Sequence, residues 1–231
     1  MIEAAEGDTV GDSAYRNIRN DIVFGQLKPS ERLRLEPLRK RYNVSVTTLR
    51  EILNRLTSDG FVVAEGQKGF EVAPVSEDDL REIADLRILL ESHALKRSFE
   101  RGDLDWEAGV VAAYHKLHVL EKKMLSGETS VREHWKNADW QFHRALISGC
   151  GSRALLETHG AVFDKYLRYQ MLTLTFRGEE AAQEHKMLHD AALAHDAETA
   201  GKVLEAHILG GVEHSIANRE ENQPNSRRKS K

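Results

Sequence analysis

Four side chains in the second half of the sequence have the types and spacing of metal ligands. Two of them, Asp139 and His143, lie four residues apart in the stretch NADWQFHRAL, so they share one face of a predicted helix. That face also carries Phe142 and Leu146, which predicts that it points into the interior. Because a buried carboxylate is costly without a partner, Asp139 and His143 form either a structural salt bridge or hydrogen bond, or half of a metal site.

Two later histidines share this inward placement. His207 falls on an apolar stripe with Leu204, and His185 precedes Leu188 by about one turn. His189, on the next turn of the same helix, is an alternative to His185. Three imidazoles and a carboxylate suit a divalent metal ion, with zinc first and nickel, manganese or iron as alternatives. Inward-facing histidines also occur as hydrogen-bonded core residues, so the spacing alone leaves both interpretations open.

The composition places these residues in a globular chain rather than in a membrane protein or a disulfide-rich one. Of 231 residues, 40% are hydrophobic and 30% are charged. No apolar run approaches the roughly 20 residues of a membrane span, and residues 1–13 are acidic without the pattern of a signal peptide. The single cysteine, Cys150, excludes an internal disulfide and fits a reducing compartment. We therefore expect a cytoplasmic protein with no membrane partner.

Residues 76–219 predict the helical bundle that would position the four candidate ligands. Ser76 and Asp79 resemble a capping box that opens a helix ending near residue 102. Helical periodicity then predicts further helices at about 104–125, 130–149, 152–176, 179–195 and 197–219. Because no strand pattern interrupts them, we expect an all-helical antiparallel bundle with ligand sites between its helices.

Residues 12–75 predict a different architecture, a winged helix-turn-helix. Asp12 or Ser13 would cap a first helix that ends near Gly25, and EPLRKRYNV and SVTTLREILNRLTSDG would form two more. Two β-rich runs flank EGQKG and predict a hairpin, the wing. Residues 1–11 and 220–231 are expected to be disordered, and the chain as a whole is expected to be mostly α.

Charge is distributed unevenly between these two predicted domains. Residues 13–75 carry 11 Lys and Arg against 7 Asp and Glu, whereas residues 76–231 carry 22 against 26. A basic N-terminal third joined to an acidic remainder is typical of a nucleic-acid-binding domain fused to a second domain. The charge therefore agrees with the helix order.

The predicted DNA-binding surface centres on the third helix, which would enter the major groove. Arg50 lies on its polar side, where it can contact a guanine edge or a phosphate. Ser45, Thr47 and Thr48 lie at its N-terminus, where free N–H groups attract phosphate. Further phosphate contacts are expected from the second helix and the wing tip, at Arg39, Lys40, Arg41, Lys68 and Gly69. The alternative is that these side chains simply form a solvated face.

The stretch VSVTTLREILNRLTSDGFVVAEGQKGFEV resembles the DNA-binding segment of GntR-type bacterial transcription regulators. The second half resembles the all-helical FCD effector domain of the FadR-like subfamily, and the two likenesses together cover about residues 13–215. They imply a homodimeric repressor, not an enzyme, that binds double-stranded operator DNA and responds to a small carboxylate effector. Arg50 matches the family. Val46 stands where the family often has arginine, and Glu36 stands where its fatty-acid regulator has one, so base contacts do not carry over to these two positions.

The resemblance also implies roles for polar residues of the bundle. Many FCD domains hold a divalent metal with an Asp-x-x-x-His pair on one helix and two later histidines, and the four candidate ligands fall onto that pattern. Small organic acids bind beside this metal in the family. Arg87, Arg168 and Tyr169 are the residues expected to bind the effector carboxylate. Arg87 also has Glu91 four residues on, which is an alternative salt-bridge partner.

Two shorter likenesses concern the effector. FHRALISGCGSRALL and QKGFEV resemble the branch that represses glutarate and 4-aminobutyrate catabolism, which implies a five-carbon dicarboxylate such as glutarate. Two alternatives to a metal-dependent sensor remain. In one, Asp139 only hydrogen-bonds the histidines, and the protein senses a carboxylate without metal. In the other, a metal with open positions activates water for hydrolysis, but no separate base and nucleophile stand out in the helices.

Overall fold

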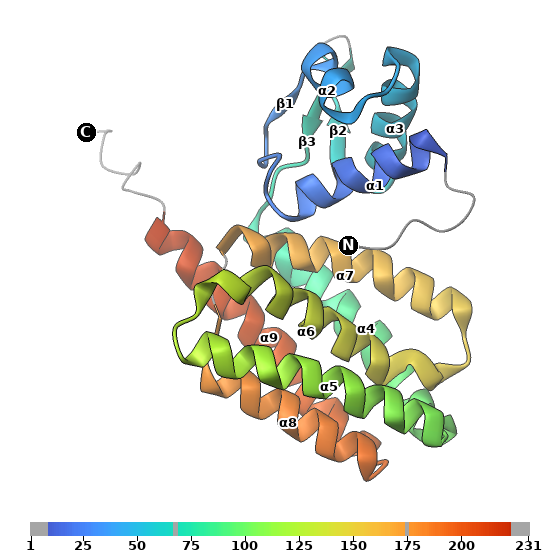
Figure 1. Ribbon diagram of the computed structural model, residues 1–231, viewed down its shortest axis with the longest axis vertical. Coiled ribbons are helices and arrows are strands. Elements are labelled where there is room, and N and C mark those ends of the chain that lie inside the picture. The colour runs from blue at the N-terminus through green and yellow to red at the C-terminus, as the bar shows by residue number, and fades with distance from the viewer. Residues whose placement is uncertain (1–8, 67–68, 174–175, 223–231) are drawn as a thin grey trace. The chain divides into compact units, whose positions relative to one another are not determined.

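The computed structural model divides into two compact units and describes residues 9–66, 69–173 and 176–222 (Figure 1). One unit comprises the chain up to Asp79 together with Leu167–Leu172. The other comprises Leu80–Tyr166 and the chain from Thr173 onward. Within the described residues, no helix is both long enough and apolar enough to cross a membrane.

The described residues from 9 to 73 contain the predicted winged helix-turn-helix. Their helices are α1 (Val10–Val23), α2 (Leu35–Tyr42) and α3 (Val46–Ser58). The strands β1 (Arg32–Leu33), β2 (Val62–Ala64) and β3 (Phe70–Val72) form an antiparallel sheet in the order β1-β3-β2. The β2–β3 hairpin is the wing, and its residues 67 and 68 lie outside the described residues.

Helix α1 begins earlier than the sequence pattern predicted. The hydroxyl of Thr9, rather than Asp12 or Ser13, caps the helix by accepting from the Asp12 N–H at 3.1 Å. The Asp12 carboxylate in turn accepts from the Thr9 N–H, which completes a capping box. The disorder predicted for residues 1–11 therefore does not extend to residues 9–11, and residues 1–8 lie outside the described part of the chain.

Helix α3 forms for local reasons that the sequence shows. Ser45 caps it, since its Oγ accepts from the Thr48 N–H at 3.1 Å. Its apolar stripe is buried and consists of Leu49, Ile52, Leu53 and Leu56. The chain then turns at Gly60, whose φ of +80° is easily adopted only by glycine. Arg50 lies on the opposite, exposed face of the helix.

Six long helices follow the winged domain, as the sequence predicted. They are α4 (Glu77–Arg101), α5 (Leu104–Leu125), α6 (Arg132–Ile147), α7 (Arg153–Thr173), α8 (Glu179–Leu193) and α9 (Ala197–Asn222). Short 3-10 turns at Thr129–Val131 and Ser148–Cys150 flank α6. Helix α9 continues beyond the predicted boundary at residue 219, so the predicted disordered tail began too early.

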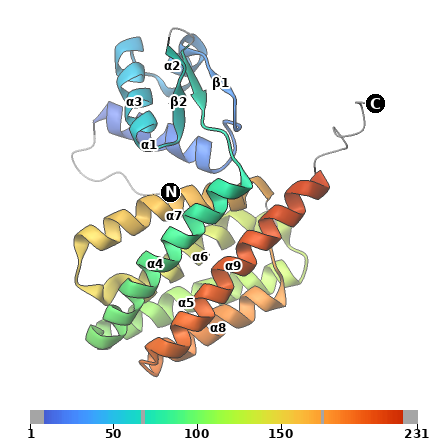
Figure 2. The same cartoon turned by 180° about the vertical axis from the view of Figure 1, so that it is seen from behind.

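The packing of these helices creates an interior that is partly polar. Helix α5 runs beside both α6 and α8, and α9 lies beside α8 (Figures 1 and 2). Large side chains such as Phe142, Phe163 and Tyr166 are fully buried. Charged and polar side chains are buried as well, including Arg87, Glu91, Glu121, Asp139, His143 and His185. Buried charges are costly unless they are paired. This polar interior is therefore the candidate for a functional site in the helical unit.

Candidate metal centre

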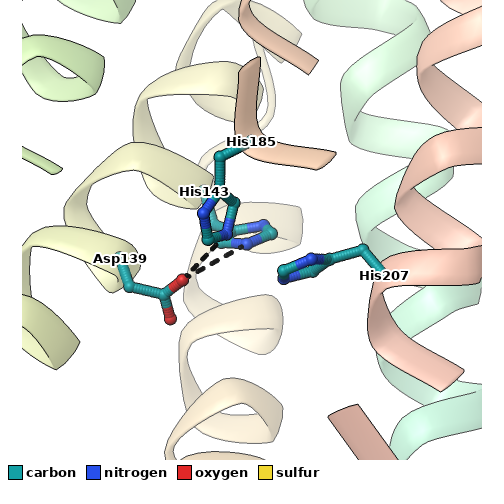
Figure 3. Close-up of side chains that lie close together, drawn as sticks. All are labelled: Asp139, His143, His185 and His207. Atoms are coloured by element: carbon teal, nitrogen blue, oxygen red, sulfur yellow. Dashed lines mark ion pairs between the residues drawn. The ribbon is translucent and has the colours of Figure 1, made fainter. Parts of the chain in front are cut away.

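The four candidate ligands converge between three helices (Figure 3). Helix α6 supplies Asp139 and His143, α8 supplies His185, and α9 supplies His207. Their donor atoms all lie within 4.8 Å of one another, and all four side chains except that of His207 are fully buried. The structure thus brings together the four residues that the sequence pattern singled out.

His189, the alternative to His185, lies elsewhere. Its ring stacks on that of Tyr114, with the ring centroids 4.3 Å apart. Its Nδ1 lies 3.0 Å from the Asp190 carboxylate, which is exposed. Helix α8 therefore directs His185, and not His189, toward Asp139.

Each histidine of the cluster is oriented by a carboxylate at its Nδ1 atom. The Nδ1 atoms of His143, His185 and His207 lie 2.5, 2.6 and 2.7 Å from carboxylate oxygens of Glu91, Glu121 and Glu184, respectively. A ring whose Nδ1 donates to a carboxylate presents the lone pair of Nε2 on its other side. Metal-binding histidines are held in this way, because the carboxylate fixes the tautomer and makes the ring more basic.

The Nε2 atoms show that the residues fit a bound cation. That of His143 is buried and has no hydrogen-bond partner among the described residues, and that of His185 is buried and forms an ion pair with Asp139 that lacks hydrogen-bond geometry. They lie 3.9 and 3.1 Å from Asp139 Oδ1. The first distance is too long for the Asp139–His143 hydrogen bond that the sequence left open. A buried unsatisfied nitrogen costs free energy, and a divalent ion between these lone pairs and Asp139 would remove that cost.

The electrostatics of the cluster also favour a cation. Although burial raises the pKa of Asp139, attraction to neighbouring cationic groups holds it well below its ordinary value. Burial lowers the pKa of His143 and of His207, so both imidazoles are neutral. Burial acts on His185 in the same direction, but ion pairs with two carboxylates outweigh it and raise its pKa to about 9. A metal ion at this place would displace that proton.

Arg87, one of the predicted effector-binding residues, is already paired inside the bundle. Its Nε donates to Glu91 Oε2 at 2.8 Å, and both side chains are buried. Its guanidinium lies over the rings of Phe163 and Tyr166, 4.5 and 4.6 Å from their centroids. Its Nη2 lies 3.2 Å from His143 Nδ1. The i,i+4 salt bridge that the sequence left open is therefore formed, and it lies directly beside a candidate ligand.

The two other predicted effector residues, Arg168 and Tyr169, belong to the segment of α7 that groups with the N-terminal unit. Arg168 donates to the carbonyl of Ala73, and the Tyr169 hydroxyl donates to the Asp79 carboxylate. Both side chains thus have protein partners apart from the candidate metal ligands.

Several residues that support the cluster were missed by the sequence analysis. Lys136 lies three residues before Asp139 on α6, and that spacing was a usable signal. Glu121 follows the buried Leu117 by one turn of α5, so a carboxylate in an apolar stripe was also visible. Arg177 precedes α8 outside any helix, and no local pattern marks it.

The predicted DNA contacts lie on the winged helix-turn-helix, and among the arginines predicted for this role Arg50 is the one without a carboxylate partner in the described residues. It is exposed and has no hydrogen bond or ion pair to any described residue. Arg39 and Arg41, by contrast, pair with Glu36 at 2.7 Å and with Asp21 at 2.5 Å. A DNA phosphate has to compete with these carboxylates for the two arginines.

The other predicted contacts are at the start of α3 and at the wing. Ser45 and Thr48 are engaged in the helix cap, while Thr47 between them is exposed. Gly69 has a φ of +98°, as expected for a tight turn. Lys68 lies outside the described residues. The N-terminus of α3 therefore presents its free N–H groups next to an exposed hydroxyl, as an anion-binding helix end does.

Comparison with known proteins assigns both halves of the chain. Residues 11–72 match the family model for bacterial regulatory proteins of the gntR family, and residues 82–210 match the FCD domain model. The HTH-type transcriptional regulator BphR of Paraburkholderia xenovorans (strain LB400) is 38% identical over 203 residues, which cover 87% of this chain and 83% of that protein. The HTH-type transcriptional repressor GlaR of Escherichia coli (strain K12) is 34% identical over 201 residues, which cover 84% of this chain and 90% of that protein.

The solved structure of E. coli McbR/YncC shows the same fold. It superposes with a TM-score of 0.77 at 21% identity and covers 92% of this chain and 99% of that one. The BphR and GlaR relatives are transcription regulators and not enzymes, which removes the hydrolase alternative. The chain is therefore a DNA-binding transcription regulator that belongs to the GntR family and carries a C-terminal FCD domain.

Proposed function

We propose that this regulator is a repressor whose operator affinity is set by a small organic acid bound beside a divalent metal ion. The observation that carries the proposal is the convergence of Asp139, His143, His185 and His207, whose donor atoms lie within 4.8 Å of one another. The unsatisfied Nε2 atom of His143 and the anionic carboxylate of Asp139, which His185 Nε2 also faces, favour a cation there. Zinc is the first candidate, with nickel, manganese or iron as alternatives, because this donor set suits all four.

For the effector we propose a small carboxylate, with glutarate as one candidate. Support for a repressor comes from GlaR, which is named a transcriptional repressor and is 34% identical. Arg87 is the residue proposed to contact the effector beside the metal. The same role for Arg168 and Tyr169, which bond to Ala73 and Asp79 within the N-terminal unit, stays a prediction from the resemblance. Arg87 retains donors for this role, because a guanidinium has five N–H groups and Glu91 engages only its Nε.

Operator binding implies a homodimer in this proposal. One winged helix reads one half-site, and a two-fold dimer reads a palindrome of double-stranded DNA. Ligand binding and operator binding are then linked reciprocally, so an acid that weakens operator binding must itself bind more weakly to the DNA-bound protein. Arg50 at the exposed face of α3 is the proposed base-contacting residue.

The test is metal analysis of untagged protein by mass spectrometry. Wild type is expected to hold about one ion per chain, and Asp139→Ala and His207→Ala to lose most of it, because each removes a ligand. His189→Ala is the matched control, since it removes an imidazole from α8 that lies outside the cluster. Equal metal content in all four proteins contradicts the metal site.

The same metal-loaded protein is then screened by thermal shift against mono- and dicarboxylates of two to six carbons. A ligand that binds only the native state must raise the Tm. A stabilising acid whose effect disappears in Arg87→Ala supports the effector proposal, and the absence of any stabilising acid contradicts it.

A carboxylate sensor without metal is the second candidate. It is favoured by Lys136, whose Nζ lies 2.8 Å from Asp139 Oδ2 and already gives this buried carboxylate a cationic partner. This candidate predicts metal-free protein in every variant. It also predicts a carboxylate response that a chelator does not change.

A further inference from the structure

Lys136 is a buried cation in direct contact with a candidate metal ligand. It is 8% exposed, and its Nζ lies 2.8 Å from Asp139 Oδ2. Asp139 turns its other oxygen, Oδ1, toward the Nε2 atoms of His185 and His143, at 3.1 and 3.9 Å. A single carboxylate therefore separates the ammonium of Lys136 from the point on which the histidines converge.

Two arginines also lie beside the cluster, but their pairing is different. Arg87 pairs with Glu91 at 2.8 Å, and Arg177 pairs with Glu184. These two glutamates are not among the four converging donors, so a metal ion would leave both pairs intact. The carboxylate that Lys136 contacts is Asp139, which a metal ion would share. A bound metal would therefore weaken the ion pair between Lys136 and Asp139. The ammonium of Lys136 would then be a buried charge without full compensation, which is costly.

Among the described residues, Asp139 is the acceptor that the Lys136 ammonium contacts. An ammonium has three N–H donors, and Asp139 Oδ2 provides one acceptor. The ring of Trp135, whose centroid is 5.0 Å from Nζ, covers the ammonium without offering an oxygen. The indole Nε1 of Trp135 is itself buried with no hydrogen-bond partner among the described residues. A small anion with acceptor oxygens supplies what these neighbouring donors need.

The charge around the cluster agrees with an anionic ligand of low charge. Three cationic side chains face four carboxylates inside the bundle, those of Asp139, Glu91, Glu121 and Glu184. A fifth, Glu180, lies 3.7 Å from Arg177 but is exposed to solvent and is left out of this sum. Once metal coordination has displaced the proton of His185, this set carries one net negative charge, which a divalent ion reverses to one net positive charge. A single carboxylate restores neutrality in this interior.

We propose that Lys136 is a specificity-determining residue of the effector site, and that its ammonium binds the ligand carboxylate held beside the metal. This inference rests on the proposed function, since it presupposes the metal. It adds the charge of Lys136 to the donors that Arg87 retains beside its pair with Glu91. The ligand class is an organic acid that presents one carboxylate at this end of the site.

The experiment uses the full-length protein loaded with Co²⁺, whose visible absorption changes when a ligand enters its coordination shell. Acetate is titrated into wild type, Lys136→Met, Lys136→Arg and Lys122→Met. Lys122 is an exposed lysine of α5 and provides the matched control. Because Lys136 contacts Asp139, its replacement is expected to alter Co²⁺ affinity, so acetate is titrated at saturating Co²⁺ in all four proteins. Acetate affinity is expected to fall about 10–100-fold in Lys136→Met, to recover in part in Lys136→Arg, and to be unchanged in Lys122→Met.

The outcomes separate this inference from the proposed function. Unchanged acetate affinity in Co²⁺-loaded Lys136→Met overturns the inference and leaves the metal site standing. A wild-type spectrum that does not respond to acetate overturns it as well. Failure of wild type to bind Co²⁺ overturns the proposed metal site itself. If Lys136→Met does not fold, Lys136→Gln takes its place, because it keeps a polar side chain beside Asp139 while removing the charge.

Discussion

At the scale of single residues, the orientation of the histidines depends on glutamates from elsewhere in the fold. Glu91 of α4 and Glu121 of α5 hold the Nδ1 atoms of His143 and His185 at 2.5 and 2.6 Å. These contacts fix the rotation of each ring, so that Nε2 faces Asp139. Without them, a histidine could turn either nitrogen toward the cluster, and a preformed set of lone pairs would be lost.

Glu121→Gln tests this dependence. Glutamine keeps the size and one acceptor oxygen but removes the charge that orients His185, so metal affinity is expected to fall about 10–100-fold. Competition with a chromophoric chelator measures the change. Glu205→Gln, on the exposed surface of α9, is the control and should bind metal as wild type does. Equal affinities in all three proteins would show that Glu121 has no supporting role.

The sequence identified the converging residues but not their partners. Asp139 and the histidines could be found because they interrupt apolar stripes at helical spacing. The glutamate contacts join residues that are 52 and 64 positions apart in the chain, and periodicity along one helix contains no information about them. Pairing across helices is a property of the packed bundle.

At the scale of elements, helices are predictable where their signals are local. Helix α3 has its cap, its buried stripe and its terminating glycine within 16 residues, from Ser45 to Gly60. The start of α1 was predicted too late. Its capping box, Thr9 with Asp12, precedes the apolar stripe from which the helix was predicted. Local signals that lie outside the periodic pattern are easily passed over.

Arg50→Ala tests α3 as the DNA-reading element. If Arg50 contacts a base edge, the operator affinity falls by about 1–3 kcal/mol. The Tm is expected to stay unchanged, because the side chain is exposed and unpaired among the described residues. Fluorescence anisotropy at fixed salt, on DNA selected in vitro by wild type, gives the affinity. Arg39→Ala, which removes an arginine already paired with Glu36, should lose less. An unaltered Kd for Arg50→Ala contradicts the assignment.

At the scale of the whole molecule, the chain divides into two compact units. The candidate ligands Asp139, His143, His185 and His207 all belong to the helical unit. A metal ion that binds only the folded cluster stabilises that unit by mass action. The stabilising effect of metal is therefore expected to be concentrated in one part of the chain.

Hydrogen–deuterium exchange measures which helices lose protection when the metal is removed. Chelation is expected to speed amide exchange in α6, α8 and α9, which carry the candidate ligands, and to change α3 much less. Asp139→Ala should exchange like the chelated wild type and show no further response to chelator. A chelator effect of equal size in wild type and Asp139→Ala would mean that metal acts at another place.

The distance along the chain between Asp139 and His207 has a consequence in polymer terms. An ion held by both would close a loop from residue 139 to residue 207, a span of 68 residues. A covalent cross-link over such a span lowers the conformational entropy of the unfolded chain and thereby stabilises the folded state by about 4 kcal/mol. The sequence has one cysteine and cannot form a disulfide within itself, so the ion would act as a reversible staple. The stability of the folded regulator, and not only its response to an acid, would then depend on the concentration of metal in the cell.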